Sequence, residues 1–269
     1  VLFSLGKRVV SVSNDPKPKI ITALDRYCPE VVICADGIHS LGRELLIGQM
    51  APYFTGHVAW RALVPNTTDH ADVARIYLGP KKHVVTYPIR DRTVLNLVLV
   101  EERDTWTKES WSERGDADCL RRSFREFNLG IGDLLSQVQA PYLWGLFRHP
   151  VAKKWHAGGV VLLGDAAHPT LPFMAQGANL ALEDAWVLAR CLSKTSVRDT
   201  SLQTYQDIRK KRVGRIISVA EGNAWKYHLT FPPLKWAAQK TMRAMSQVMP
   251  GRMVGQFDWI YRHDVTEVL

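Results

Sequence analysis

The sequence predicts a mixed α/β protein with an antiparallel sheet in its middle. Two short apolar runs, Val31–Ala35 and Gly158–Leu163, have the continuous hydrophobicity of buried parallel strands. Between them, residues 57–100 alternate strand-like runs with turn residues, which is typical of an antiparallel meander. After Gly177, apolar residues recur at helical spacing. Parallel-type strands that lead into helices, combined with an antiparallel block, define the mixed class.

The strands come first along the chain. Lys7–Val12 and Lys19–Leu24 are expected as strands because an Asn-Asp-Pro turn signal separates two β-rich runs. Within the central block we expect four strands: His57–Leu63, Val73–Leu78, His83–Tyr87 and Thr93–Val100. After the block we expect two helices and one further strand: Asp116–Asn128, Asp133–Val138 and Leu143–Phe147.

The C-terminal part is expected to be helical. Apolar residues lie nearly all round the predicted helix that begins at Gly177, which is typical of a buried helix. Asp199 or Thr200 can cap the long helix that follows, and two consecutive prolines end it. A last amphipathic helix is expected over Leu234–Val248.

Composition narrows the class of protein. The chain has 269 residues, of which 46% are apolar, and a net charge of +9, so we expect a globular protein. No apolar run approaches the roughly 18 residues that a membrane helix needs. The four cysteines lie far apart and lack zinc-binding spacing, so we expect no metal site and a reducing, cytoplasmic environment.

The strongest motif is the stretch from Gly159 to Ala185. A buried strand ends at Gly164 and Asp165, where α/β proteins bind ligands. Gly164 has no Cβ and allows close approach, and the Asp165 carboxylate can accept a hydrogen bond from a sugar hydroxyl. The helix that begins at Gly177 offers free N–H groups and a positive dipole end.

A second motif extends from Val31 to Arg43. It is again a buried strand that runs into an Asp-Gly turn, at Asp36, and it ends in an arginine that can pair with phosphates. An Asp-Gly pair by itself is only a turn signal.

In this order and spacing, the two motifs resemble the DG and GD motifs of the flavoprotein aromatic hydroxylases. These are single-component FAD monooxygenases with the p-hydroxybenzoate hydroxylase fold, and the branch that this chain resembles is the salicylate hydroxylase group. Three further stretches support the resemblance: Gly56–Pro65, Gly79–Pro88 and Asp258–Asp264.

The resemblance implies the C-terminal part of a FAD-binding hydroxylase fold, with an antiparallel-sheet substrate domain and a helical tail. The implied domains are a partial FAD-binding domain with the DG motif, a substrate domain, a return to the FAD-binding domain with the GD motif, and C-terminal helices. Their bounds are 1–50, 51–150, 151–195 and 196–269.

The resemblance also implies roles for individual residues in holding FAD. Asp165 is expected at the flavin-side ribose, Gly164 at the pyrophosphate and Pro172 beside the flavin ring. Gly177 and Ala178 are expected to offer N–H groups to the pyrimidine edge of the flavin. Two further residues belong to a motif that contacts both FAD and NAD(P)H: Asp36 and Arg43. His168 follows Asp-Ala-Ala in a pattern that recurs in the family. A purely structural hydrogen bond is an equally good interpretation of this histidine.

His83 and Tyr87 match a His-x-x-x-Tyr pair that faces the aromatic substrate in this branch. Residues four apart on a strand point to the same face. A histidine can take the proton of a phenol, and a tyrosine can hydrogen-bond the phenolate. A core-lining role is the alternative interpretation of this pair. We expect His57, Trp60 and Pro172 to shape the pocket.

The chain departs from the family at its start, because it lacks the strand–GxGxxG–helix unit that wraps the ADP half of FAD. The nearest candidate, at Gly130 and Gly132, has Leu135 in place of the third glycine and follows no strand, so we reject it. The sequence begins at Val1, which fits an N-terminally truncated chain. Such a truncation is expected to leave Val31–Ala35 and Val160–Leu163 without a neighbouring strand.

The function expected from the resemblance is hydroxylation of a small phenolic, hydroxybenzoate-like substrate with FAD, NADH or NADPH, and O₂. A homodimer is possible, and no nucleic-acid partner or membrane span is expected. A catalytically inactive remnant is one alternative. A basic binding module for an anionic partner is another, because basic residues cluster over Arg209–Arg212 and at Arg215. We interpret that cluster as a solvated helix face.

Overall fold

The computed structural model forms two compact units. Unit 1 comprises residues 1–53, 148–221 and 254–269, and unit 2 comprises residues 54–147 and 222–253. The described residues are 1–268 without the following: 69, 107–112, 128–129, 196, 228–232, 234–235, 237–239, 242–247, 249–250 and 252–254.

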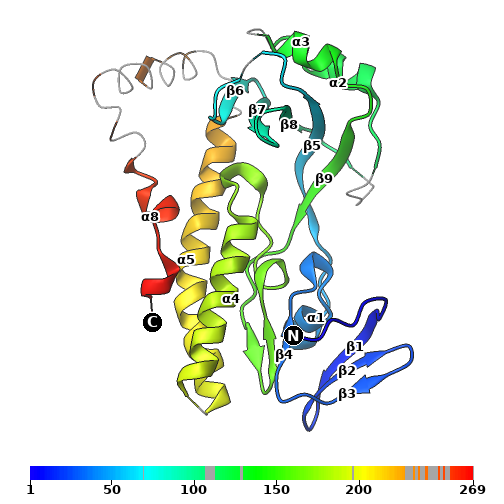
Figure 1. The fold of residues 1–269 in the computed structure, drawn as a ribbon, viewed down its shortest axis with the longest axis vertical. Helices are drawn as coiled ribbons and strands as arrows, with labels where there is room; N and C mark the ends of the chain where they lie inside the picture. The colour runs from blue at the N-terminus through cyan, green and yellow to red at the C-terminus, as the bar shows by residue number, and fades with distance from the viewer. Residues whose placement is uncertain are drawn as a thin grey trace. The chain divides into compact units, whose positions relative to one another are not determined.

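Unit 1 contains two small sheets (Figure 1). One is antiparallel and is formed by β1 (Val9–Asn14), β2 (Pro18–Thr22) and β3 (Arg26–Tyr27). The other has the order β10 (His156–Ala157), β11 (Val160–Leu162) and β4 (Val32–Cys34). Since β11 pairs with β4 in parallel, the expectation that these two strands lack a neighbour is wrong: each is the neighbour of the other.

The parallel pairing brings the two sequence motifs together. The strand β4 is followed by a 3₁₀ turn (Gly37–His39) and α1 (Leu41–Ile47), and β11 is followed by a second 3₁₀ turn (Gly164–Ala166). Because β4 and β11 are adjacent and parallel, their carboxyl ends lie at the same edge of the sheet.

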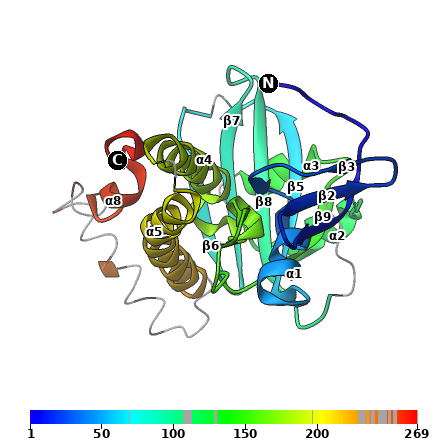
Figure 2. The same cartoon turned by 90° about the horizontal axis from the view of Figure 1, so that it is seen from below.

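Two long helices, α4 (Gly177–Lys194) and α5 (Arg198–Tyr227), lie side by side (Figures 1 and 2). The pattern of apolar residues predicted that α4 is buried on all sides, and this prediction is wrong. Leu182 is 70% exposed and Trp186 is 43% exposed, because only one side of the helix packs onto the core of unit 1. The helix α5 begins at Arg198, so Asp199 lies in its first turn, where a negative charge suits the helix dipole, rather than at the cap.

Unit 2 contains a five-stranded sheet with the order β6-β7-β8-β5-β9. Its strands are β5 (Tyr53–Pro65), β6 (Arg75–Gly79), β7 (Lys82–Ile89), β8 (Val94–Glu102) and β9 (Tyr142–Arg148). The predicted meander holds for β6, β7 and β8. The strand β5 pairs antiparallel with β8 instead of with its sequence neighbour β6. Two short helices of this unit, α2 (Ala117–Ser123) and α3 (Ile131–Ser136), correspond to the predicted ones, although Asn128 lies outside the described residues.

The sheet of unit 2 has one apolar face. Trp60 of β5, Val84 of β7 and Leu97 of β8 belong to one core cluster, and Leu120 and Phe124 of α2 belong to the same cluster. The opposite face carries the alternate residues of the same strands. Only predicted site residues that lie on the same face of the sheet can line one pocket.

The C-terminal end of unit 1 contains α8 (Asp258–Tyr261) and a 3₁₀ turn (Val265–Glu267). The last predicted helix, over 234–248, falls largely on residues outside the described ranges. Among the helices of the described ranges, none is both long and apolar enough to cross a membrane.

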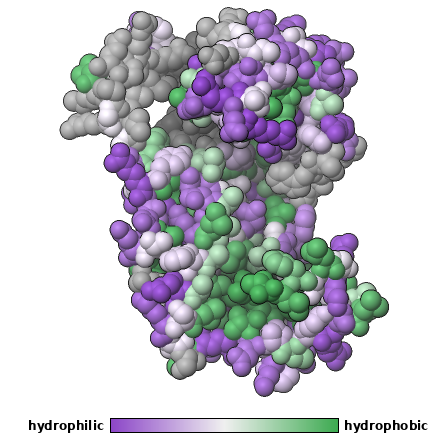
Figure 3. Space-filling view, viewed as in Figure 1, coloured by the Kyte–Doolittle hydropathy of each residue, from purple (hydrophilic) through white to green (hydrophobic). Residues whose placement is uncertain are grey.

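Unit 1 exposes apolar side chains on the face seen in Figure 3, over the region of β4, α1 and α4. The exposed apolar residues of these elements include Ile33 of β4, which is 48% exposed, and Leu45 of α1, which is 39% exposed. A contiguous exposed apolar surface is an interaction or aggregation site.

The core of unit 2 can be tested at β5, whose residues alternate between the two faces. Trp60→Ala is expected to lower the free energy of unfolding by about 3–5 kcal/mol, because the indole is 1% exposed and leaves a large cavity. Leu63→Ala is the matched control on the same strand: Leu63 is 50% exposed, and the expected loss is about 1 kcal/mol or less. Urea denaturation measures both, and equal losses would show that the faces are assigned wrongly.

Candidate functional site

The turn after β11 requires glycine for two reasons. Gly164 has a φ of +62°, which favours glycine. A Cβ at this position would also come within 3.0 Å of the Cβ of Ala181 in α4. The buried N–H of Gly164 donates to Oδ2 of Asp184 at 3.0 Å. Packing of the turn onto α4 therefore excludes a side chain here, whatever ligand approaches.

Asp165 follows in this turn, and its side chain is exposed. The surrounding protein raises the pKa of Asp165 above its ordinary value of 3.8 by desolvation, and the nearby His168 partly opposes this shift. The carboxylate is thus presented to solvent at the edge where the two parallel strands end. It is an acceptor available to a sugar hydroxyl.

The loop that follows leads to the start of α4. Pro172 begins a 3₁₀ turn (Pro172–Met174) and is exposed, and Ala175 after it has a left-handed φ of 51°. The N-cap residue of α4, Gln176, makes no side-chain capping hydrogen bond among the described residues. Gly177 and Ala178 therefore begin the helix with N–H groups that no cap occupies, and the positive end of the dipole adds to their attraction for an electron-rich group.

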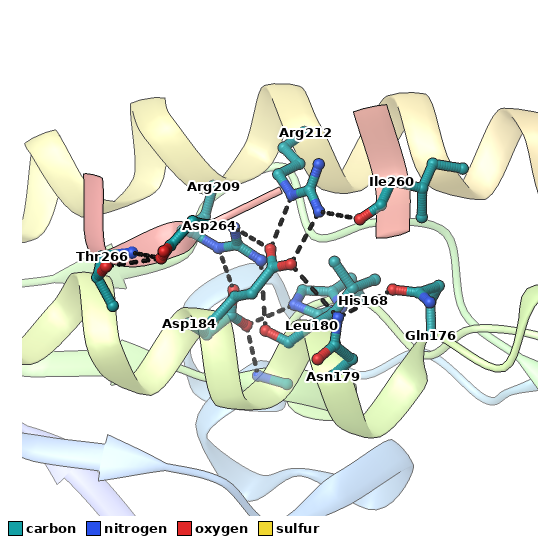
Figure 4. Close-up of polar contacts among 12 residues, drawn as sticks. His168, Gln176, Asn179, Leu180, Asp184, Arg209, Arg212, Ile260, Asp264 and Thr266 are labelled. Carbon is teal, nitrogen blue, oxygen red and sulfur yellow. Dashed lines mark hydrogen bonds and ion pairs between the residues drawn. The ribbon is translucent and has the colours of Figure 1, made fainter. Parts of the chain in front are cut away.

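A buried ionic cluster holds this loop and helix in place (Figure 4). Arg209 of α5 donates from Nε to Oδ1 of Asp184 at 2.7 Å and from Nη1 to Oε2 of Glu183 at 2.6 Å. Arg212, one turn further on, binds both oxygens of Glu183 at 2.8 Å. The side chains of Arg209, Glu183 and Asp184 are at most 6% exposed. This cluster joins α4 to α5 in the core of unit 1.

His168 connects the cluster to the loop. Its Nε2 lies 2.6 Å from Oδ2 of Asp184, the same oxygen that accepts the N–H of Gly164. His168 is fully buried and packs against the ring of Trp155, with ring centroids 5.1 Å apart. The structural hydrogen bond is therefore present, and Asp184 fixes both ends of the segment from Gly164 to His168.

The C-terminal segment binds the same cluster. Arg212 donates to the carbonyl oxygens of Trp259 at 2.9 Å and Ile260 at 3.1 Å, and the hydroxyl of Tyr261 donates to the carbonyl of Met174 at 3.2 Å. The loop before α4 is thus held from both sides within unit 1.

The acidic residues of the cluster have shifted pKa values. Burial by itself raises the pKa of Asp184, but the hydrogen bond and charge of His168, together with Arg209, outweigh it and lower the pKa below the ordinary 3.8. Burial likewise opposes the shift of Glu183, whose pKa the two arginines lower below 4.5. Both carboxylates are therefore ionised at neutral pH.

The turn after β4 is organised by Asp36 and Arg43. Oδ2 of Asp36 accepts the N–H of Leu41 at 2.8 Å at the start of α1. Arg43 is 3% exposed, and its terminal nitrogens donate to the carbonyls of Ala166 and Ala167, both at 3.1 Å, and to that of Pro150. Burial lowers the pKa of Arg43. The predicted phosphate-binding arginine thus ties the two motif turns together, and only its covered Nε has no partner among the described residues.

In unit 2, the predicted substrate residues divide between the two faces of the sheet. His83 and Tyr87 lie on the same face of β7, as expected, and the ladder places His57 on that face too. Trp60 lies on the opposite, core face, where its Nε1 donates to Glu101 at 3.0 Å. The expectation that Trp60 lines the same pocket is wrong, because residues 57 and 60 are an odd number apart on one strand.

Sequence reasoning missed the partners of the basic cluster on α5. The interpretation of Arg209–Arg212 as a solvated face is wrong for its two arginines: Arg209 is 1% exposed and the side chain of Arg212 is 12% exposed. The available signal was the pair of adjacent acids Glu183 and Asp184, which interrupts an apolar stretch of helix α4. Burial of Arg209 and Arg212 removes two cations from a basic binding surface, which weakens the binding-module alternative.

Comparisons with known proteins show the family to which this chain belongs. The FAD binding domain family matches residues 26–220. The chain therefore belongs to this family, whose region contains the two motif turns, the uncapped start of α4 and the sheet with His83 and Tyr87.

Two relatives and one solved structure illustrate the similarity. The chain is 31% identical to 3-amino-4-hydroxybenzoate 2-monooxygenase PtnB3 of Streptomyces platensis, over 88% of this chain and 60% of that protein. It is 29% identical to salicylate hydroxylase of Pseudomonas putida, over 98% of this chain and 66% of that protein. A salicylate hydroxylase substrate complex has a TM-score of 0.82 at 26% identity, over 98% of this chain and 69% of that one. The chain spans about 60% of the length of the first of these relatives.

The described residues contain no group of three or more His, Cys, Asp or Glu side chains that could hold a metal ion. The four cysteines are free thiols.

The ionic cluster makes a testable contribution to stability. Asp184→Asn is expected to lower the free energy of unfolding by about 3–5 kcal/mol near pH 7, because it leaves Arg209 buried with one partner fewer. The folded-state pKa of Asp184 lies below 3.8, so its contribution is complete above that value and is lost as the pH falls through the folded-state pKa. Urea denaturation of both proteins from pH 7 to pH 3 should show the difference shrinking at the acid end.

Asp199→Asn is the matched control on α5, since the Asp199 side chain is 71% exposed in its ion pair with Arg198. Its expected effect is about 0–1 kcal/mol. An equally small loss in Asp184→Asn would contradict the assigned role of the cluster.

Proposed function

We propose that this chain carries the flavin site and the substrate sheet of an aromatic hydroxylase. In this proposal FAD lies at the turn of Gly164 and Asp165 and at the start of α4, and NADH or NADPH and O₂ are co-substrates. The observation that supports this proposal is the exposed Asp165 carboxylate beside the start of α4, which has no side-chain cap. The buried cluster holds both features in place, and the chain is a member of the FAD binding domain family.

The residues at this site fit a flavin. The isoalloxazine is apolar over its rings and carries acceptor atoms at its pyrimidine edge, and the N–H groups of Gly177 and Ala178 would meet those acceptors. Pro172 is exposed and would lie against the ring, and Asp165 would accept a ribose hydroxyl. FAD would supply the redox chemistry, and the protein supplies binding, orientation and exclusion of water.

The aromatic substrate would lie on the face of the sheet that carries His83 and Tyr87. A neutral histidine can accept the proton of a phenolic hydroxyl, and a phenolate ring is more nucleophilic than a phenol ring. Tyr87 can donate its hydroxyl proton to the phenolate oxygen. Relatives named for 3-amino-4-hydroxybenzoate, salicylate and 6-hydroxynicotinate support a small hydroxylated aromatic acid as the substrate class.

We place the protein in the cytoplasm, because its four cysteines are free thiols, as expected in a reducing compartment. A homodimer is compatible with the exposed apolar side chains of unit 1.

Flavin binding tests the proposal directly. The full chain should show saturable FAD binding when flavin fluorescence is titrated, and Asp165→Ala should weaken it at least tenfold by removing the ribose acceptor. Asp207→Ala, an exposed aspartate on α5, is the matched control and should leave binding unchanged. Absence of binding by a folded chain would mean that these residues are insufficient for the proposed function.

FAD affinity should also depend on pH. The pKa of Asp165 is raised above 3.8, and the ionised carboxylate is the stronger acceptor, so affinity falls as the pH falls through that raised value. Asp165→Asn should flatten the profile measured between pH 7 and pH 4. A profile identical in both proteins would argue against contact between Asp165 and the cofactor.

Turnover tests the roles of His83 and Tyr87. With FAD bound, His83→Ala is expected to reduce kcat/KM for a hydroxybenzoate by about 10²-fold or more, the usual value of a general base. Tyr87→Phe should give a smaller loss. His156→Ala, in unit 1, is the control and should retain activity. The measurement is NAD(P)H oxidation together with product analysis. Unchanged kcat/KM in both His83→Ala and Tyr87→Phe would show that neither residue takes part in the reaction.

A further inference from the structure

The C-terminal segment, residues 258–267, makes one contact that its own anchoring does not require. Arg212 of α5 donates to the carbonyl oxygen of Ile260 at 3.1 Å (Figure 4), and Ile260 is 1% exposed in the core of unit 1. The next residue, Tyr261, is 58% exposed, and its hydroxyl donates to the carbonyl oxygen of Met174 at 3.2 Å. The segment is therefore held without Tyr261, whose hydroxyl contacts a different element, the loop before α4.

The hydroxyl of Tyr261, more than its ring, explains a tyrosine at this position. A side chain that is largely exposed gains little from burial of its apolar atoms. Desolvation raises the pKa of Tyr261 above its ordinary value of 10, so the hydroxyl stays protonated at neutral pH. A protonated hydroxyl can donate and a carbonyl oxygen can only accept, so the direction of the bond to Met174 is fixed.

The carbonyl that accepts this bond precedes a strained residue of the backbone. Ala175 has a φ of 51° and a ψ of 32°, which is the left-handed region that alanine adopts only at a steric cost. Such a conformation persists where the surrounding structure determines it. Two hydrogen bonds restrain this turn: the N–H of Ala175 donates to the carbonyl of Pro172 at 3.1 Å, and Tyr261 donates to Met174. The second bond comes from a residue 87 positions further along the chain.

We infer that Tyr261 is a positioning residue for the flavin, because its hydroxyl holds the loop before α4 on its left-handed path. That path sets where Pro172 and the first N–H groups of α4 lie, on either side of Ala175. Tyr261 acts through the backbone at Met174 and Ala175 and does not touch the reacting atoms. The inference rests on the proposed function, in which FAD lies against this loop, and it gives the C-terminal segment a role in that site.

Removal of the hydroxyl alone tests the inference. Tyr261→Phe in the full chain keeps the ring and is expected to raise the dissociation constant of FAD about fivefold, the usual effect of one hydrogen bond. The visible absorption spectrum of the bound flavin at saturation should also shift, because the groups around the ring move. Fluorescence titration and absorption spectroscopy measure both effects. A purely structural role would lower Tm and leave the dissociation constant and the spectrum unchanged.

Tyr27→Phe is the matched control in unit 1. The Tyr27 side chain is also partly exposed, at 40%, and its hydroxyl also makes one hydrogen bond, which it accepts from Nζ of Lys7 at 3.0 Å. This bond lies in the sheet of β1, β2 and β3, so Tyr27→Phe should leave FAD binding and the flavin spectrum unchanged.

A double substitution tests the link to the left-handed backbone. Glycine adopts a positive φ without a steric cost, so Ala175→Gly removes the strain that the Tyr261 hydroxyl opposes. In the Ala175→Gly background, Tyr261→Phe is therefore expected to weaken FAD binding less than twofold. An equal fivefold loss in both backgrounds would mean that the hydroxyl does not act through this backbone, and it would overturn the inference.

Hydrogen exchange tests the contact without any flavin. The N–H of Ala175 is protected by its bond to Pro172, and exchange requires this turn to open. In the FAD-free protein, Tyr261→Phe should raise the exchange rate of this amide at least threefold, and Tyr27→Phe should not change it. Unchanged exchange in Tyr261→Phe would show that the hydroxyl does not hold the loop.

The outcomes separate this inference from the proposed function. Equal FAD binding by the wild type and Tyr261→Phe overturns the positioning role and leaves the proposed function intact. A loss of FAD binding that is equally large in Tyr27→Phe also overturns the positioning role. If the folded wild type binds no FAD, the proposed function fails for this chain, and the positioning role fails with it.

Discussion

The arrangement of unit 1 depends on the buried ion pairs between α4 and α5. Charges such as those of Arg209 and Asp184 are costly to remove from water, and they are stable only when every partner is present at short distance. Asp184 meets this requirement with three donors, from Arg209, His168 and the backbone of Gly164. A shift of α4 against α5 would break several of these bonds together, so the relative position of the two helices is fixed.

This constraint explains how the exposed edge where we propose that FAD binds is held in place. The segment from Gly164 to His168 is fixed at both ends by one carboxylate, and Arg43 binds its carbonyls at Ala166 and Ala167. The polar groups that hold the segment are buried, and those that face outward, Asp165 and the first N–H groups of α4, remain available. Preorganised donors and acceptors of this kind need no rearrangement when a ligand binds.

Because its strands alternate, the sheet of unit 2 separates an apolar core face from the face where we propose that the substrate binds. Its apolar face packs against α2, and the indole of Trp60 and the aliphatic residues of β8 contribute to that core. The other face carries His83 and Tyr87, with Asn96 and Arg61 beside them. Because one residue of slip exchanges the two faces, the same register that buries Trp60 also sets the polar group on the other side.

The sequence by itself determined the mixed fold class, most strand positions, the two motif turns and the shared face of His83 and Tyr87, because these follow from local periodicity. Parity along the strand also separates His57 from Trp60, although both were expected to shape the pocket. Only the tertiary structure decided that β4 and β11 are neighbours, that Arg209 and Arg212 are buried on Glu183 and Asp184, and that the amide nitrogen of Asn96 has no partner among the described residues. These contacts join residues of separate elements, and no local pattern encodes which element lies opposite.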